Sequence, residues 1–142
     1  MDLNAEKLSS VWEKYKSTLV LPKEDAIPAR QFFLCPVGLV GAGKSTVIKP
    51  LSERLSLVRI SSDEIRKMLK ERGAGYDQLL EVVGPLAEEL AAQGFSLAFD
   101  GDCGNPKTKE MITELVDKVD AKVLWIHVNP PEEFIRLLPK AL

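Results

Sequence analysis

The stretch Gly38-Leu39-Val40-Gly41-Ala42-Gly43-Lys44-Ser45-Thr46 decides how the rest of the chain is interpreted. It fits the pattern of a phosphate-binding loop, or P-loop: a glycine, four residues of any type, a glycine, a lysine, and then a serine or threonine. Backbone N–H groups at the start of a helix bind phosphate oxygens, and side chains at the glycine positions would block that approach. We therefore expect a set of residues in this stretch to bind the phosphates of a nucleotide: Gly38, Gly41, Ala42, Gly43, Lys44, Ser45 and Thr46.

The segments on either side have the composition that a P-loop requires. Residues 31–37 form an apolar run, which predicts a strand leading into the loop, and residues 44–55 have apolar side chains near helical spacing. The alternative is a glycine turn followed by a chance lysine, and it does not explain both flanks. We expect Lys44 to place a mobile positive charge on the phosphates. The Ser45 hydroxyl is expected to coordinate a Mg²⁺ ion shared with the nucleotide.

Strands and helices alternate along the rest of the chain. Apolar runs predict further strands over 56–60, 95–99 and 121–128, and helical spacing predicts helices over 4–19, 61–72, 76–93 and 106–119. Such alternation predicts an α/β fold of three layers, with a short parallel sheet of about four strands and helices on both faces. We expect two parts, an N-terminal helix with an extended connection over 1–30 and the P-loop domain over 31–142.

Local signals define some of these boundaries. Pro50 should kink or end the helix after the P-loop, and Gly84 with Pro85 should break or bend the helix over 76–93. Ser61 and Glu64 form a capping box, in which each side chain bonds a free N–H group of the helix start.

Composition and charge exclude several classes of protein. The net charge of −2 over 142 residues argues against an extended nucleic-acid-binding surface. The longest apolar run, over 32–40, is far below the ~20 residues that a membrane helix needs, and the N-terminus lacks the pattern of a signal peptide. We therefore expect a cytoplasmic protein with no membrane partner. Cys35 and Cys103 are isolated and indicate neither a zinc site nor a disulfide framework, so we expect buried or incidental thiols.

Ligands of open parallel sheets bind beyond the carboxyl ends of the strands, where this chain has polar residues. Asp63 and Arg66 are three apart and share a helix face, so Asp63 could accept a proton from an attacking hydroxyl while Arg66 binds a phosphate. Equally, Asp63 could stabilise the helix start and simply pair with Arg66. Asp100 follows an apolar strand, the position at which many NTPases hold an acid that engages Mg²⁺. Asp102 could do the same work, and the alternative is that Asp100 is a solvated turn acid. His127 lies in an apolar strand and is interpreted as a core histidine.

Together, the motifs GLVGAGKST, ISSDEIR, FDGD and WIHVNPPEE resemble P-loop kinases of the group that includes polynucleotide 5′-hydroxyl kinases and zeta-toxin-like kinases. The resemblance covers about residues 31–138. It implies that Asp63 contacts or deprotonates an acceptor hydroxyl, that Arg66 binds acceptor phosphate, and that Asp100 belongs to the acceptor or metal site. Nucleoside monophosphate kinases share the Asp100-Gly101 pair, but their following proline and basic residue come earlier than Pro106 and Lys107 here, which argues against a mononucleotide acceptor.

Kinases of this group usually continue past the fourth strand into an arginine-bearing lid and a fifth strand, so the resemblance predicts a truncated domain. The predicted function is ATP- and Mg²⁺-dependent transfer of the γ-phosphoryl group to a hydroxyl of a small molecule, a nucleotide or a nucleic-acid 5′ end. Lys44, Asp63 and Arg66 are the expected catalytic residues, and Ser45 and Asp100 the expected metal ligands. The alternative is a module that binds ATP without efficient turnover. A signalling GTPase is disfavoured, because no NKxD guanine motif is present.

Overall fold

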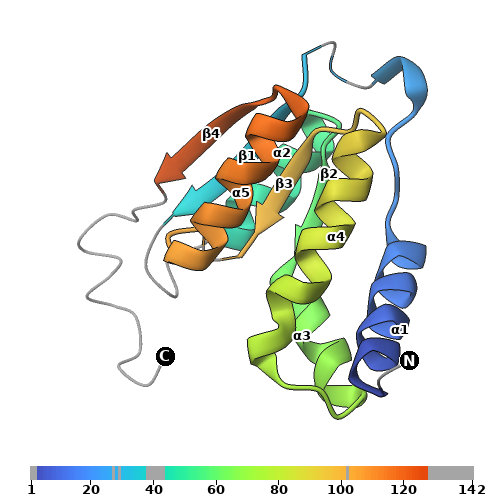
Figure 1. The fold of residues 1–142 in the computed structure, drawn as a ribbon. Coiled ribbons are helices and arrows are strands. Elements are labelled where there is room, and N and C mark those ends of the chain that lie inside the picture. The colour runs from blue at the N-terminus through green and yellow to red at the C-terminus, as the bar shows by residue number, and fades with distance from the viewer. Residues whose placement is uncertain (1–2, 27, 29, 38–43, 102, 128–142) are drawn as a thin grey trace.

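Four parallel strands form the sheet around which the chain is built (Figure 1). The computed structural model describes residues 3–26, 28, 30–37, 44–101 and 103–127. The strands lie in the order β2-β3-β1-β4, which puts β1 and β3 at the centre. Their bounds are Phe32–Val37 for β1, Val58–Ser61 for β2, Leu97–Asp100 for β3 and Lys122–His127 for β4. The predicted parallel sheet of about four strands is therefore confirmed.

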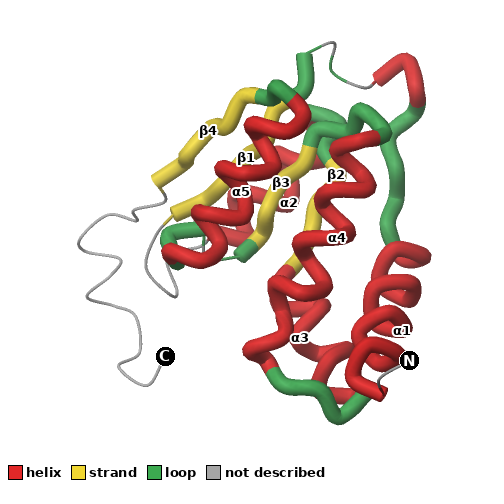
Figure 2. The backbone as a smooth tube through the Cα atoms, in the orientation of Figure 1, coloured by secondary structure: helices red, strands yellow, loops and turns green. Residues whose placement is uncertain are grey.

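Helices cover both faces of the sheet, which gives the predicted three layers (Figure 2). One face is covered by α2 (Lys44–Arg54), and the other by α4 (Leu79–Ala92) and α5 (Pro106–Val119). Helix α3 (Ser62–Glu71) follows β2, and α1 (Leu3–Thr18) packs beside α3 and α4. Two short 3₁₀ helices, η1 (Glu24–Ala26) and η2 (Tyr76–Gln78), complete the described elements.

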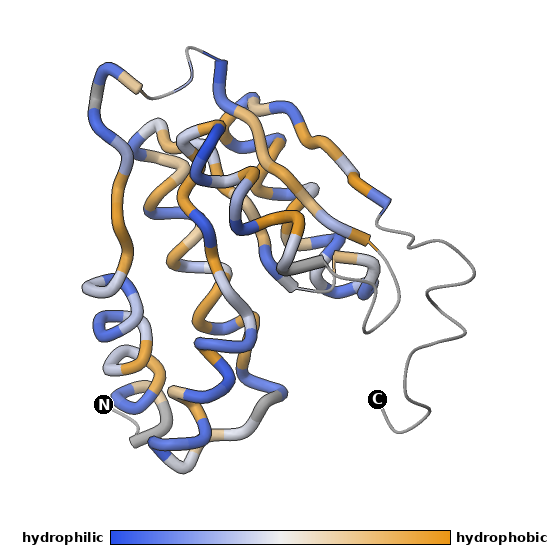
Figure 3. The backbone as a smooth tube through the Cα atoms, turned by 180° about the vertical axis from the view of Figure 1, so that it is seen from behind, coloured by the Kyte–Doolittle hydropathy of each residue, from blue (hydrophilic) through white to orange (hydrophobic). Residues whose placement is uncertain are grey.

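The core has two parts because the sheet buries both of its faces. On the α2 side, Ile48 packs with Leu34, Leu57 and Ala98 in a small cluster. On the other side a larger cluster joins strand residues such as Phe33 and Phe99 to α1, α3, α4 and α5. Figure 3 shows hydrophobic segments along the strands and along parts of the helices. Every residue of β3 is buried, as its continuous apolar run predicts.

Strand β4 is less buried than its apolar sequence suggests. It pairs only with β1 among the described strands, and each of its side chains is exposed or half-buried. Leu124 is 50% exposed, and His127 is exposed at the end of the strand. The interpretation of His127 as a core histidine is therefore wrong, because the strand order puts β4 at an edge that no described helix fully covers.

Two prolines lie inside helices, and neither proline ends its helix. Helix α2 continues through Pro50, and α4 continues through Gly84 and Pro85. The predicted end or break at these residues is therefore wrong, whereas the predicted kink or bend stays a prediction. Each proline removes one hydrogen bond to the carbonyl four residues earlier, but packing on both sides of it keeps the helix formed. In α4, for example, Val82 and Leu86 are both fully buried.

The N-terminal helix is confirmed and belongs to the core. Val11 and Tyr15 of α1 are 0% and 1% exposed and pack within the larger cluster. Cys35 and Cys103 are both buried and unbridged, as predicted. Among the described helices, none is both long enough and apolar enough to cross a lipid bilayer.

Candidate functional site

The carboxyl ends of β1, β2 and β3 meet at one edge of the sheet. Strand β1 ends at Val37 and α2 begins at Lys44, so a strand precedes the predicted P-loop and a helix follows it. Gly38, Gly41, Ala42 and Gly43 lie outside the described residues. Lys44, Ser45 and Thr46 form the first turn of α2, where helix N–H groups can bind an anion.

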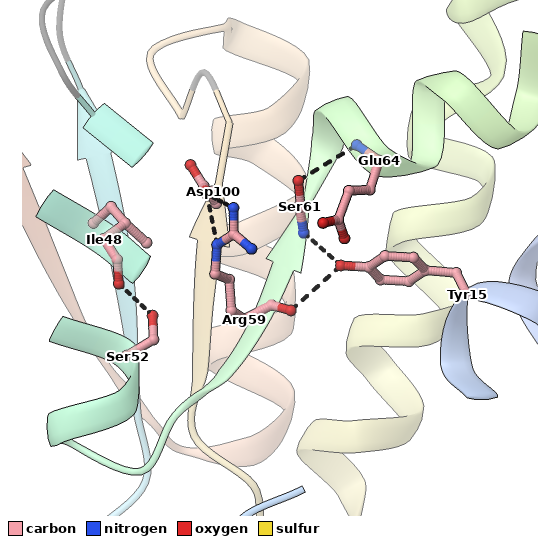
Figure 4. A network of polar contacts seen from close by, with 7 residues as sticks. All are labelled: Tyr15, Ile48, Ser52, Arg59, Ser61, Glu64 and Asp100. Carbon is pink, nitrogen blue, oxygen red and sulfur yellow. Dashed lines mark hydrogen bonds and ion pairs between the residues drawn. The ribbon is translucent and has the colours of Figure 1, made fainter. Parts of the chain in front are cut away.

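Asp100 ends β3, the strand next to β1, and its carboxylate is almost fully buried. The side chain is 3% exposed and forms an ion pair with Arg59 of β2, which is 24% exposed. Arg59 Nε lies 2.7 Å from Asp100 Oδ2, and Arg59 Nη2 lies 2.5 Å from the same oxygen (Figure 4). Arg59 is in register with Ala98, which packs against α2, so the pair lies on the α2 face. Asp100 therefore stands on the side of the sheet where the P-loop helix lies.

Tyr15 of α1 fixes the end of β2. Its hydroxyl accepts a hydrogen bond from the Ser61 N–H at 2.7 Å and donates a longer one to the Arg59 carbonyl at 3.4 Å (Figure 4). Val58 bonds toward β3, so the backbone groups of Arg59 and Ser61 point to the opposite, open edge of β2. The hydroxyl thus takes the place of a neighbouring strand. Burial raises the pKa of Tyr15 to about 12, which keeps it protonated.

The predicted capping box is only half formed. Ser61 is the N-cap of α3, and its hydroxyl accepts a bond from the Glu64 N–H at 3.4 Å. The predicted reciprocal bond from the Ser61 N–H to Glu64 is wrong, because Tyr15 takes that N–H group.

Asp63 and Arg66 lie together in the first two turns of α3, as their spacing predicts. Arg66 Nη1 lies 3.3 Å from Asp63 Oδ1, and the side chains of Arg66 and Asp63 are 42% and 87% exposed. This geometry agrees with the structural alternative, in which Arg66 pairs with Asp63 at the helix start. Their catalytic roles stay predictions.

A cavity of about 260 Å³ opens at the ends of β2 and β3 on the face opposite Asp100. We call it the strand-end cavity. Its wall carries the cations Arg66 and Lys107 and the neutral polar residues Ser62, Asn105 and Thr108, and its floor is apolar, with Ile60, Val83 and Phe99. Asp77 adds a carboxylate, whereas Asp63 does not line it. A charged wall over an apolar floor suits a small organic anion.

Gly101 lines the strand-end cavity and directly follows Asp100 in the sequence. A Cβ atom at Gly101 would lie 2.9 Å from Ser62 Cβ, so only glycine permits this close approach of the two strand ends. Phe99 and Asp100 are consecutive in β3 and their side chains point to opposite faces. The P-loop helix and the strand-end cavity therefore flank the same strand end from two sides.

The Asp100 carboxylate suits Mg²⁺ as an ion shared with a nucleotide. Mg²⁺ is usually held by one or two protein oxygens, by phosphates and by waters, and a buried carboxylate can supply one of these oxygens. The metal roles of Ser45 and Asp100 stay predictions. Among the described residues no group of three or more His, Cys, Asp or Glu side chains is placed to hold a metal without such help. Arg59 already neutralises Asp100, so a metal ion would have to share that carboxylate with Arg59 or displace it.

Sequence reasoning missed the roles of three residues in this region. Arg59, Tyr15 and Lys107 were not assigned to a site, although Arg59 carried a signal: a charged residue within an apolar strand needs a partner when the strand is buried. Tyr15 and Lys107 had no such signal, because their roles depend on where α1 and the start of α5 are placed in space.

Comparison with known families agrees with this geometry. Residues 34–137 match the model of a family described as an AAA domain. The chain belongs to the AAA domain family. The matched segment begins in β1, so α1 lies outside it. Its limits are close to residues 31–138, the range that the kinase resemblance covers.

A solved structure shows the same fold. It is the Mycobacterium tuberculosis APS kinase CysC in complex with AMPPNP and APS, which matches the AAA domain with a TM-score of 0.57 and 19% sequence identity. The match covers 80% of this chain and 72% of that chain. Among curated proteins no match was found. The fold of the AAA domain is thus that of a P-loop NTPase and is shared with a P-loop kinase. The narrower resemblance to polynucleotide 5′-hydroxyl and zeta-toxin-like kinases stays a prediction.

Proposed function

We propose that the protein is an ATP- and Mg²⁺-dependent phosphotransferase that moves the γ-phosphoryl group to a hydroxyl of a small anionic molecule. The observation that carries the proposal is the position of the strand-end cavity. It opens at the same edge of the sheet as the start of the P-loop helix, with Arg66 and Lys107 on its wall. The kinase of the same fold was solved with AMPPNP and APS, a nucleotide analogue and a second ligand. A donor side and an acceptor side at one edge suit transfer between two bound molecules.

On the donor side, the P-loop backbone would cradle the phosphates and Lys44 would bridge the β- and γ-phosphates. Mg²⁺, held by Ser45 and Asp100, would neutralise charge on the transferred group. On the acceptor side, Arg66 and Lys107 would hold the anionic group of the acceptor so that its hydroxyl faces the γ-phosphorus.

Asp63 would accept the proton of that hydroxyl as its oxygen attacks the γ-phosphorus. The bond from the γ-phosphorus to the bridging oxygen then breaks, and ADP leaves. Asp63 stands one helical turn before Arg66, with which it is paired. A rotation of its side chain is therefore needed for this role.

The second candidate function is nucleotide binding without efficient turnover. The exposure of Asp63 favours it, because the expected base lies outside the lining of the strand-end cavity. The two candidates differ in a single observable, the formation of a phosphorylated product.

The test measures ADP release and product mass with a panel of hydroxyl acceptors that carry phosphate, sulfate or carboxylate groups. Lys44→Ala should lower the rate by about 10²-fold or more, because it removes a charge that acts on the transferred phosphoryl group. Lys49→Ala is the matched control, since Lys49 is an exposed lysine of the same helix. Equal rates for the native chain and Lys44→Ala would refute the kinase. Tight ATP binding without product would favour the second candidate.

A further inference from the structure

The ion pair between Arg59 and Asp100 uses the same carboxylate that the proposed function assigns to Mg²⁺. Two guanidinium nitrogens, Nε at 2.7 Å and Nη2 at 2.5 Å, both lie against Asp100 Oδ2. Both nitrogens lie on this one carboxylate oxygen, so a metal ion or a metal-bound water that approaches Oδ2 must displace the guanidinium from it. The positive charge of Arg59 also repels a divalent cation, and this repulsion is strong around a carboxylate that is 3% exposed.

Arg59 has a second position available. Its side chain is 24% exposed and lines a cavity of about 240 Å³ between α1, α2 and β2. Glu53 of α2 and Glu64 of α3 line the same cavity. A guanidinium that leaves Asp100 can therefore enter this cavity and find another carboxylate, so that its charge remains paired.

We propose that Arg59 is an exchangeable counter-ion that competes with Mg²⁺ for Asp100. In the metal-free protein Arg59 pairs with Asp100, and when the metal and nucleotide bind Arg59 moves toward Glu53 and Glu64. The device keeps the buried carboxylate neutralised in both states. It also lowers the affinity for the metal by the free energy needed to move Arg59 from Asp100 to its second position. The inference rests on the proposed function in one respect, the role of Asp100 at the metal.

The test measures how strongly Mg²⁺ and nucleotide help each other to bind. The dissociation constant of AMPPNP is determined by calorimetry with EDTA and with saturating Mg²⁺, and the ratio of the two values is the coupling factor. Arg59→Met should raise this factor by about tenfold or more, because the Asp100 carboxylate then attracts the metal without a competing guanidinium. Asp100→Asn should lower it. The double variant should resemble Asp100→Asn, because Arg59 acts only through that carboxylate.

Two further variants keep the test decisive. Arg54→Met changes the net charge equally at an exposed arginine of α2 and should leave the coupling factor unchanged. If Arg59→Met does not fold, Arg59→Lys replaces it, since lysine keeps the charge but loses the planar fork and should give a smaller rise. An unchanged or lower coupling factor in the folded Arg59 variant would overturn the inference, as would a factor that Asp100→Asn does not alter.

Failure of this inference can be told apart from failure of the proposed function. If the coupling factors are as expected but no phosphorylated product forms, the counter-ion inference holds and the proposed kinase function fails. If the protein phosphorylates an acceptor but its coupling factor does not depend on Arg59, the proposed kinase function holds and the counter-ion inference fails.

Discussion

Replacing Tyr15 by phenylalanine removes one oxygen atom and two hydrogen bonds at the end of β2. The ring stays in the core, where Tyr15 is 1% exposed, so the packing of α1 changes little. The Ser61 N–H, in a residue that is 3% exposed, loses its 2.7 Å bond and has no described strand beyond it. An unpaired buried donor costs about 1–3 kcal/mol, and the 3.4 Å bond to the Arg59 carbonyl adds little. We expect Tyr15→Phe to lower the free energy of unfolding at pH 7 by about this amount.

This difference should shrink at high pH. Burial raises the pKa of Tyr15 to about 12; Glu64 and Asp100 also raise it, whereas the bond from Ser61 and the charge of Arg59 lower it. The unfolded chain releases the phenol proton near pH 10. Between pH 10 and 12 the unfolded state therefore binds fewer protons than the folded state, and the native protein loses stability that Tyr15→Phe does not lose. Two pKa units correspond to about 2.7 kcal/mol, so the two proteins should become nearly equal by pH 12.

Urea unfolding followed by far-ultraviolet circular dichroism at pH 7, 9, 10, 11 and 12 provides the measurement. Only the difference between the two proteins is interpreted, because lysines titrate in the same range. Tyr76→Phe changes the second of the two tyrosines and serves as the control. If the stability difference between the two proteins were the same at pH 7 and pH 12, the Tyr15 hydroxyl would not be buried and hydrogen-bonded as described. A Tyr15→Phe protein as stable as the native one at pH 7 would contradict the same description.

Three further predictions concern the site and the helices. Arg66→Ala should raise the KM for an anionic acceptor by about tenfold or more, while the nucleotide dissociation constant changes less than about twofold. An equal rise in both constants would contradict the position of Arg66 at the acceptor. Gly101→Ala puts a Cβ atom 2.9 Å from Ser62 Cβ and should cost about 1–3 kcal/mol in urea unfolding, so an unaffected variant would contradict the close approach. Pro50→Ala should stabilise the protein by about 1–2 kcal/mol in the same assay, because α2 runs through this position and alanine restores a helical hydrogen bond. A less stable Pro50→Ala protein would show that the proline itself packs favourably.

The order of elements could be predicted from the sequence because each boundary has a local cause. The apolar run over 95–99 corresponds to β3 at Leu97–Asp100, and the predicted helix over 106–119 matches α5. Asn105 caps α5 with its side chain, and a proline occupies the first helical position, where its missing N–H does no harm. The effect of the prolines inside α2 and α4 could not be predicted, because it has no purely local cause. Whether a helix survives a proline depends on packing at both ends of the interruption, which is not a local property.

The individual site residues could be predicted from the sequence, but their partners could not, because the partners depend on the order of the strands. Asp100 could be singled out because an acid after an apolar strand is a local pattern, and Asp63 with Arg66 because helical spacing is local. The partners of these residues are not local. Arg59 and Asp100 are 41 residues apart, and Tyr15 and Ser61 are 46 apart, so their contacts exist only because β2 lies between α1 and β3.

The charge of Arg59 nevertheless narrows the possible strand neighbours of β2. An arginine inside a short apolar strand must either reach solvent or meet a carboxylate, because a buried unpaired charge costs far more than the strand gains from its neighbours. The acid that it meets is the one at the end of an adjacent strand, since in a parallel sheet residues of the same face lie side by side. Asp100 satisfies this condition and also stands beside the P-loop helix. If the proposed counter-ion exchange is right, this acid serves two cations in turn, and the same ion pair then sets both how tightly the metal binds and how stable the end of β2 is.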